Sequence, residues 1–322
     1  MISIKIGDQY LDLAKSGTVS MDINNPMFGA GTIPGSLSYP FSLPANSPTN
    51  AKVLGFPEHL ARSEKPKTIE GAQLFIEGVL YKTGRLIYRG FDGKNYKYNL
   101  STDTGSIKEQ IESMTLGDTG ILTTGVLLKD VIQEGFKLIG YNVTNQLVVY
   151  GLSNATILDT ANAGDIPFTD ALKAMQDIYN AALFINTTTK TGEIIHRNTI
   201  LSYNRAAQDI SSKLQSGWTE SEVNTIPDEP TQLKQGELQL GNGNLLSLQL
   251  EWANWRNLFR NTREVTRKAN LSIADLVNLD LSYPVWIKDE IAGTSKWLIQ
   301  QIKIQASVRD GLKPATLTLY KL

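Results

Sequence analysis

Few residues in this sequence of 322 residues could do chemistry. Cysteine is absent, and the only histidines, His59 and His196, are far apart along the chain. A nucleophilic triad needs a histidine beside its nucleophile, and thiolate or multi-histidine metal centres need ligands that this chain lacks. We therefore expect no catalytic residues, no cofactor and no metal. We interpret His196 as a surface or edge residue and His59 as part of a turn.

Two further patterns are similar to catalytic motifs but have simpler interpretations. In the pairs Asp228-Glu229 and Asp289-Glu290 the carboxylates are adjacent, so on a strand they point to opposite faces and cannot flank one glycosidic bond. We interpret both pairs as solvated turns. The stretch Gly241-Asn242-Gly243-Asn244 lacks a Gly-Lys-Ser/Thr motif, and the residues after it alternate like a strand. We therefore expect a hairpin turn here rather than a phosphate loop.

A cluster of basic and aromatic residues lies in the last third of the chain. Trp252, Trp255 and Phe259 are close to five cations, of which the arginines would share one helix face: Arg256, Arg260, Arg263, Arg267 and Lys268. Proteins that bind the phosphate backbone of nucleic acids usually carry a basic excess, whereas this chain has 31 Lys+Arg against 32 Asp+Glu. Because Trp and Arg are enriched at protein interfaces, we predict interface residues at Trp252, Trp255, Arg256 and Arg260, and no sequence-specific nucleic acid.

Residues 29–66 form a proline-rich excursion. Aromatic and aliphatic residues are interleaved with its prolines, whereas a flexible linker would contain more Gly, Ser and charge. We expect an ordered edge segment, with a short helix or turn at 50–60, that packs its aromatics onto a core or a neighbouring chain. The exposed-looking aromatics Tyr39, Phe41 and Phe56 are the predicted interface residues in this segment.

Short strands dominate the pattern of the first hundred residues. Apolar and polar residues alternate at 2–6, 18–23, 72–81, 85–88 and 94–100, with a turn signal at Asp92-Gly93. At the other end, 302–308 and 315–320 alternate around Asp310-Gly311 and predict a closing hairpin. The residues from Leu245 also alternate, which predicts another strand.

Helical spacing appears mainly in the middle of the chain. Residues 106–114 predict a short helix that Ser106 caps, with Glu109 at the capping-box position. Apolar residues recur at three- and four-residue steps from Phe168 to Leu183, which predicts a long helix with Thr169 as its N-cap. A β-hairpin follows up to residue 197, and 206–215 has the pattern of a second short helix.

These elements and the composition indicate a globular protein that is mainly β (α+β overall). Hydrophobic residues make up 41% and charged residues 20% of the chain. No run approaches roughly 18 apolar residues, so we expect no stable membrane insertion, and the first residues have no secretory pattern. We predict β-barrel or sandwich domains with an inserted helix-plus-hairpin region, divided as 1–105, 106–223 and 224–322.

Three segments resemble parts of known proteins. Thr32-Ile33-Pro34-Gly35-Ser36, continued through 39–44 and 54–57 and followed by an apolar strand and hairpin at 72–90, resembles an opening found in structural tail proteins of bacteriophages. The end, 297–304 then 310–319, is similar to the closing strands of baseplate hub proteins. The helix and hairpin at 168–197 also have a counterpart in that family.

The resemblance implies a virion protein, the baseplate or tail-tip hub of a bacteriophage, assembled in the host cytoplasm. Hubs of this family are trimeric rings with two β-barrel domains per subunit, which join the tail tube to the central spike. The implied partners are therefore copies of the chain itself and the tube, spike and baseplate proteins. The excursion at 29–66 is not an obvious part of a minimal hub barrel.

Alternative functions remain open at this point. A hexameric distal tail or tail-adaptor protein would differ in stoichiometry. A glycan- or receptor-binding module would present exposed aromatics as a sugar platform, with Trp252, Trp255, Trp286 and Trp297 as candidates. A hydrolase is least favoured, because the chain lacks the usual catalytic sets.

Overall fold

The computed structural model describes residues 1–15, 17–29, 40–55, 68–145, 151–202, 208–223, 226–290 and 293–322. Within these ranges the chain is mainly β with curled sheets and several helices, so the predicted α+β class is confirmed. No helix in these ranges is long and apolar enough to cross a membrane.

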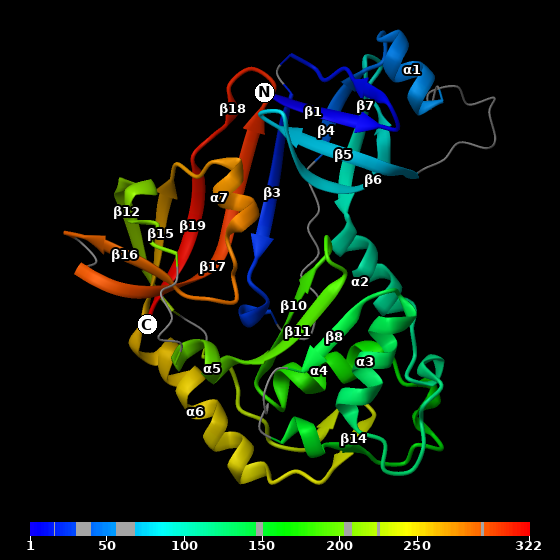
Figure 1. The fold of residues 1–322 in the computed structure, drawn as a ribbon, viewed down its shortest axis with the longest axis vertical. Helices are drawn as coiled ribbons and strands as arrows, with labels where there is room; N and C mark the ends of the chain where they lie inside the picture. Colours follow the sequence, from blue (N-terminus) through cyan, green and yellow to red (C-terminus); the bar gives the residue numbers. More distant parts are fainter. Residues whose placement is uncertain are drawn as a thin grey trace.

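The N-terminal part is a six-stranded antiparallel sheet (upper right in Figure 1). Its spatial order is β2 (Gln9–Leu11), β1 (Ile2–Ile6), β5 (Thr68–Ile76), β6 (Val79–Phe91), β7 (Asn95–Thr102) and β4 (Phe41–Pro44). The alternation in the sequence places Ile4, Leu74 and Tyr98 inside. Helix α1 (Pro48–Leu54) lies beside β2, and Ser47 caps it by accepting a bond from the Asn50 N–H.

The C-terminal part is a seven-stranded sheet that also takes in an N-terminal strand. Its main order is β12 (Leu214–Glu222), β15 (Arg263–Ala269), β19 (Ala315–Lys321), β17 (Gly293–Ser307) and β16 (Val285–Asp289). Strands β18 (Gly311–Leu312) and β3 (Thr18–Asn24) also pair with β17. The predicted closing hairpin is thus present, and β3 pairs with β17 over its full length, from Thr18–Ser307 to Asn24–Gln301.

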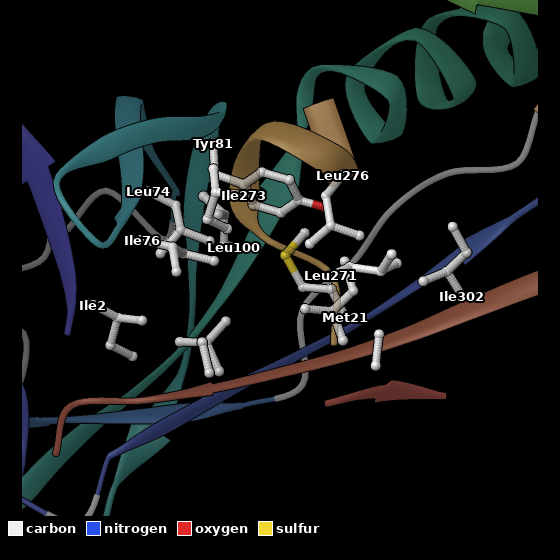
Figure 2. Packing of buried hydrophobic residues seen from close by; sticks show 14 of the residues in the cluster. Ile2, Met21, Leu74, Ile76, Tyr81, Leu100, Leu271, Ile273, Leu276 and Ile302 are labelled. Atoms are coloured by element: carbon white, nitrogen blue, oxygen red, sulfur yellow. The ribbon is translucent and has the colours of Figure 1, made fainter. Parts of the chain in front are cut away.

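One hydrophobic core joins these two sheets. Ile2, Leu74 and Leu100 of the N-terminal sheet belong to the same buried cluster as Met21 of β3 and Ile302 of β17 (Figure 2). Side chains from helix α7 (Ile273–Asn278) lie beside Tyr81 in this cluster. Burial on this scale is the main favourable term in folding, so the two sheets stabilise each other.

The middle region is an α+β layer with its own core. Strands β10 (Ala181–Asn186) and β11 (Thr191–His196) form the predicted hairpin, and β8 (Asn142–Asn145) runs parallel to β11. The helices here are α2 (Asp103–Ser113), α3 (Leu128–Leu138), α4 (Phe168–Asp177) and α5 (Arg197–Ser202). A small sheet orders β13 (Lys234–Gln235), β14 (Leu238–Gly241) and β9 (Thr156–Ile157).

Short 3-10 turns connect these elements. They are η1 (Pro26–Phe28), η2 (Gly117–Thr119), η3 (Leu152–Asn154), η4 (Ala163–Asp165) and η5 (Ser211–Lys213). The last one lies where the sequence predicted a helix over 206–215; there the chain makes one turn and enters β12, and residues 203–207 lie outside the described ranges.

Two predicted helix boundaries were wrong. Helix α2 begins at Asp103 after Thr102, so Ser106 lies inside the helix and does not form the expected capping box. Helix α4 ends at Asp177 and follows Pro167, so Thr169 is not its N-cap. Asn180 has a positive φ of 50°, a left-handed conformation that helices use to terminate, and the apolar residues after it belong to β10.

The predicted strand after Leu245 was also wrong. Leu245–Asn261 form α6, the longest helix described, and Asn244 caps it by accepting a hydrogen bond from the Ser247 N–H. The glycine-dense stretch is therefore a link between strand β14 and a helix, and not the expected hairpin turn. The hairpin of this region lies earlier, between β13 and β14.

Candidate functional site

Helix α6 connects the middle region to the C-terminal sheet (lower left in Figure 1). Its buried stripe, spaced four, three and four residues apart, consists of Leu248, Trp252, Trp255 and Phe259. This is helical spacing. The opposite face carries the exposed side chains of Leu246, Leu250 and Arg260.

The buried stripe of α6 packs into an aromatic cluster drawn from three parts of the chain. Phe28, beside the end of β3, lies 5.4 Å from Trp255 and 5.0 Å from Tyr320 of β19, measured between ring centroids. Phe259 contacts Trp255 at 5.1 Å and Tyr320 at 5.7 Å. Aromatic pairs in this range add to the energy of burial. The cluster therefore ties the N-terminal turn, α6 and the C-terminal sheet together.

A buried arginine lies at the centre of this junction. Arg197 is only 3% exposed, and its guanidinium lies 5.6 Å from the rings of both Trp252 and Trp255. It donates to the carbonyl oxygens of Met27 (2.8 Å) and Gln176 (2.7 Å). Longer bonds run to Asn180 Oδ1 at 3.3 Å and to the Gly29 carbonyl at 3.4 Å.

The charge of Arg197 has a nearby carboxylate but no direct ion pair among the described residues. Burial lowers the pKa of Arg197 to about 10, and the charge of Asp177 opposes this change. Burial likewise raises the pKa of Asp177, while Arg197 and Lys173 act in the opposite direction. Both residues line a pocket of about 550 Å³ together with Trp252 and Phe28. Arg197 donates mainly to backbone carbonyl oxygens, and it thereby holds the η1 turn against helix α4.

His196 is buried beside this arginine, so the expected surface position was wrong. It ends β11, the central strand of its sheet, and its Nε2 lies 3.9 Å from Glu251 Oε2 on α6. Burial lowers the pKa of His196, Arg197 lowers it further, and Glu251 raises it. The imidazole is therefore held neutral against the helix.

Asn25 locks the turn that carries Phe28. Its side-chain amide donates to the carbonyl oxygens of Leu281 (2.9 Å) and Ile299 (2.8 Å), and its Oδ1 accepts from the Met27 N–H at 3.0 Å. The whole side chain is buried. These bonds fix the path of the chain as it passes from β3 of the C-terminal sheet towards the middle region.

A second pocket, which we call the sheet pocket, opens on the C-terminal sheet and has a volume of about 600 Å³. Apolar walls come from Val265, Ile287, Trp297 and Leu319, with Trp218 of β12 and Leu258 of α6 beside them. Its charged lining consists of Arg263, Arg267, Lys321 and Glu220. Arg267 is 5% exposed, ion-pairs with Asp289 and donates to the Gln215 carbonyl at 3.0 Å. Its Nε–H finds no acceptor among the described residues.

Several expected exposures differ in the structure. Phe41 lies in β4 opposite Tyr98 and is buried in the core, and Trp252, Trp255 and Trp297 are buried as well. In a single chain Phe41 is therefore not an exposed contact, and of the four tryptophans considered for a sugar platform only Trp286 is partly exposed. Tyr39, Phe56 and His59 lie outside the described residues. That the predicted residues contact partners stays a prediction.

The arginines do not share one helix face. Arg256 and Arg260 are on α6, which ends at Asn261, whereas Arg263 and Arg267 are on β15. Arg256 ion-pairs with Glu229, and Arg260 remains exposed. Glu229 and Asp289, expected in solvated turns, are therefore ion-pair partners of arginines instead.

Arg197, Asp177 and Asn25 were missed by the sequence analysis. Each looks like an ordinary polar residue at the end of a strand or helix, and their partners are distant in sequence, up to 274 residues for Asn25. The stripe of Leu248, Trp252, Trp255 and Phe259 is the one signal that marks the site in the sequence. Among the described residues, no group of His, Asp and Glu side chains could hold a metal ion.

Comparison with solved structures defines the class of fold. The chain superposes over 99% of its length on the 43 kDa tail protein of prophage MuSo2 from Shewanella oneidensis, covering 96% of that chain, with a TM-score of 0.58 and 12% identity. A tail protein from Neisseria meningitidis MC58 matches over 100% of this chain and 96% of its own (TM-score 0.51, 13% identity).

A type VI secretion component from E. coli, itself structurally similar to the T4 bacteriophage tail proteins gp27 and gp5, matches over 99% of this chain and 76% of its own (TM-score 0.53, 8% identity). No family model and no curated protein matches the sequence. The predicted resemblance to bacteriophage tail proteins is thus confirmed at the level of the fold, over the whole chain.

Proposed function

We propose that this protein is a structural component of a bacteriophage tail, namely a baseplate or tail-tip hub that forms a trimeric ring between the tail tube and the central spike. The observation that carries the proposal is the fold shared with solved tail proteins along nearly the full length of both chains. Agreement over both sheets and the middle region is more specific than agreement over one domain.

The arrangement of sheets supports the trimeric form. Each chain carries one six-stranded and one seven-stranded sheet that share a core. Three chains would therefore present six of these large sheets around an axis, which suits a junction between a sixfold tube and a threefold spike. The rigid junction at Arg197 and Asn25 would keep the middle region in a fixed position relative to those sheets.

We propose a structural role rather than a catalytic one. Three titratable groups with altered pKa values near α6 are Asp177, His196 and Arg197, and they lie at a junction of packed side chains and backbone. The glycan-binding alternative loses support because three of its four candidate tryptophans are buried. The hexameric adaptor would contain six chains where the hub contains three, so the mass of the assembly separates the two.

The mass of the purified protein in solution, measured by light scattering, tests the proposal. We expect a species of three times 35.5 kDa, either alone or after addition of the tube protein that the same tail encodes. A closed species of six chains would favour the adaptor. A chain that stays monomeric with tube, spike and baseplate proteins present would contradict a role in the ring.

A further inference from the structure

The link between strand β14 and helix α6 contains the only Asn-Gly pair of the sequence, Asn242-Gly243. Asn242 is exposed and has a positive φ of 59°, a left-handed conformation that asparagine adopts more readily than most residues. Asparagine is among the thermolabile residues. It is most labile before glycine, because the backbone nitrogen of the glycine can reach the asparagine Cγ with no Cβ in the way. The pair therefore has the chemistry of a modification site.

Packing explains why a glycine follows this asparagine. A Cβ at position 243 would lie 2.9 Å from Leu233 Cδ1 and 3.1 Å from its Cδ2, so a larger residue would displace the Leu233 side chain. Leu233 packs against the core of the middle region, and its carbonyl oxygen accepts a hydrogen bond of 2.9 Å from the Leu240 N–H. The fold thus favours glycine at 243 and a residue that tolerates a positive φ at 242, and the labile pair results from both.

Neither reacting group is held by a hydrogen bond from the described residues. The Gly243 N–H has no acceptor there, and the Asn242 carboxamide has no partner. By contrast, Asn254 lies inside α6, where the N–H of the next residue is bonded four residues back. The Asn244 side chain accepts from the Ser247 N–H at 3.1 Å. Asn242 is therefore free to react where these asparagines are restrained.

We propose that Asn242 is a site of spontaneous deamidation through a cyclic succinimide, with water as the only co-reactant. The Gly243 backbone nitrogen forms a bond to Asn242 Cγ, the bond from Cγ to Nδ2 breaks, and ammonia leaves with the proton of the glycine N–H. Water then opens the ring at one of its two carbonyl carbons. Opening at Cγ gives aspartate with a normal backbone. Opening at the backbone carbonyl carbon gives isoaspartate, in which the chain runs through Cβ and Cγ.

The two products affect helix α6 differently. Aspartate at position 242 places a negative charge two residues before the N-cap Asn244, where the helix dipole favours it. Isoaspartate adds one atom to the backbone path between residues 242 and 243. Because Gly243 packs against Leu233 and Asn244 caps the Ser247 N–H, the added atom moves the cap away from that N–H. Isoaspartate should therefore weaken the start of the helix, whereas aspartate should not.

Peptide mapping of aged protein tests the proposed site. The purified full chain is incubated in warm, mildly alkaline buffer, cleaved with trypsin and analysed by mass spectrometry, with unincubated protein as the baseline. Cleavage after Lys234 and Arg256 gives one peptide that contains Asn242, Asn244 and Asn254, so the last two asparagines are internal controls.

We expect the amide at 242 to become an acid, as a mixture of aspartate and isoaspartate, while Asn244 and Asn254 stay intact. No conversion at 242, or equal conversion at all three positions, would overturn the proposal. Conversion to aspartate alone would overturn the succinimide route, because direct hydrolysis of the side-chain amide gives no isoaspartate.

A pair of variants shows where the ammonia comes from. Asn242→Gln should lose nearly all of the ammonia release, because its amide carbon lies one atom further from the Gly243 nitrogen. Asn254→Gln is the matched control and should release as much ammonia as the natural chain. The pairs Asp92-Gly93 and Asp310-Gly311 can form isoaspartate without ammonia, so they do not disturb this comparison. Equal release from Asn242→Gln and the natural chain would refute the site.

The melting temperature of the separated products tests the effect on α6. Both products carry one more negative charge than the natural chain, so ion exchange separates them from it. The isoaspartate form should melt below the natural chain, close to Asn244→Ala, whereas Asn242→Asp should melt at the same temperature or slightly higher. An isoaspartate form that melts like the natural chain would contradict the effect on the cap. These results do not depend on the oligomeric state, so they stand apart from the proposed function.

Discussion

Arg197 is a buried cation whose bonds mainly reach backbone carbonyls. Because its guanidinium donates to the Met27 and Gln176 carbonyls, Arg197→Met would remove two charge-assisted hydrogen bonds from this junction. Each bond to a charged donor contributes about 1.5–3 kcal/mol, so we expect the free energy of unfolding to fall by about 3 kcal/mol. Urea unfolding followed by tryptophan fluorescence measures this, because Trp252 and Trp255 lie at the site.

The matched control for that variant is Arg260→Met on the exposed face of α6. Among the described residues its guanidinium has only a long bond of 3.5 Å to Asn257, so the change should stay within about 0.5 kcal/mol. Equal losses in the two variants would contradict the central position that we give to Arg197.

His196 makes the stability of the fold depend on pH. Burial lowers its pKa in the folded state below the ordinary value of 6.5. As the pH falls through 6.5, the unfolded chain therefore binds a proton that the folded chain does not, and the free energy of unfolding decreases. Above that pH the contribution is fully present.

The comparison with His196→Asn isolates this effect, since other groups titrate equally in both proteins. We expect the difference in unfolding free energy between the natural chain and His196→Asn to shrink as the pH falls from 7 to 5. A difference that is constant over this range, measured by urea unfolding, would refute the neutral buried imidazole.

The burial and the hydrogen-bond partners of single polar residues such as His196 and Arg197 were the least predictable part of the site. The sequence shows that His196 and Arg197 follow an apolar strand, but burial depends on α6, which arrives about fifty residues later. An isolated polar residue carries no periodic signal, so neither its burial nor its carbonyl partners could be derived.

Helix α6 shows how two periods compete within one element. Leu246, Leu248 and Leu250 alternate like a strand, which led to the wrong prediction. The longer pattern of Leu248, Trp252, Trp255 and Phe259 and the cap at Asn244 are helical, and they decide the structure because the stripe is buried against the junction. The turn at Asp92-Gly93 and strand β7 after it were predictable from local signals, whereas the turn between β5 and β6 lies at Glu77-Gly78, inside the expected strand 72–81.

The cap of α6 provides a test at the scale of the element. Asn244→Ala removes the acceptor of the Ser247 N–H, and a lost N-cap costs about 1 kcal/mol. The melting temperature should fall accordingly in calorimetry. Asn254→Ala, at an exposed position inside the same helix, should leave it unchanged or slightly higher. If Asn244→Ala melts as the natural chain does, another group starts the helix.

At the scale of the whole molecule, the sheets exchange strands across the predicted boundaries. Strand β3 lies within residues 1–105 but pairs with β17, and β14, within 224–322, pairs with β9 of the middle region. Local patterns predicted these strands but contain no information about partners so distant in sequence. The boundaries themselves stay a prediction that limited proteolysis would test.

This exchange of strands makes the chain mechanically one unit. Strand β3 near the N-terminus pairs with β17 near the C-terminus, and Asn25 and Arg197 hold the middle region to them, so we expect the chain to behave as one unit when a ring forms. A rigid subunit suits the proposed ring, because the ring must contact a sixfold tube on one side and a threefold spike on the other.

Electron-microscope class averages of the purified protein, with its tube protein present, test the central claim most directly. We predict a threefold ring of three chains with six sheet-containing lobes around an open centre. Averages with six identical subunits, or particles of a single chain in the presence of all tail partners, would contradict it.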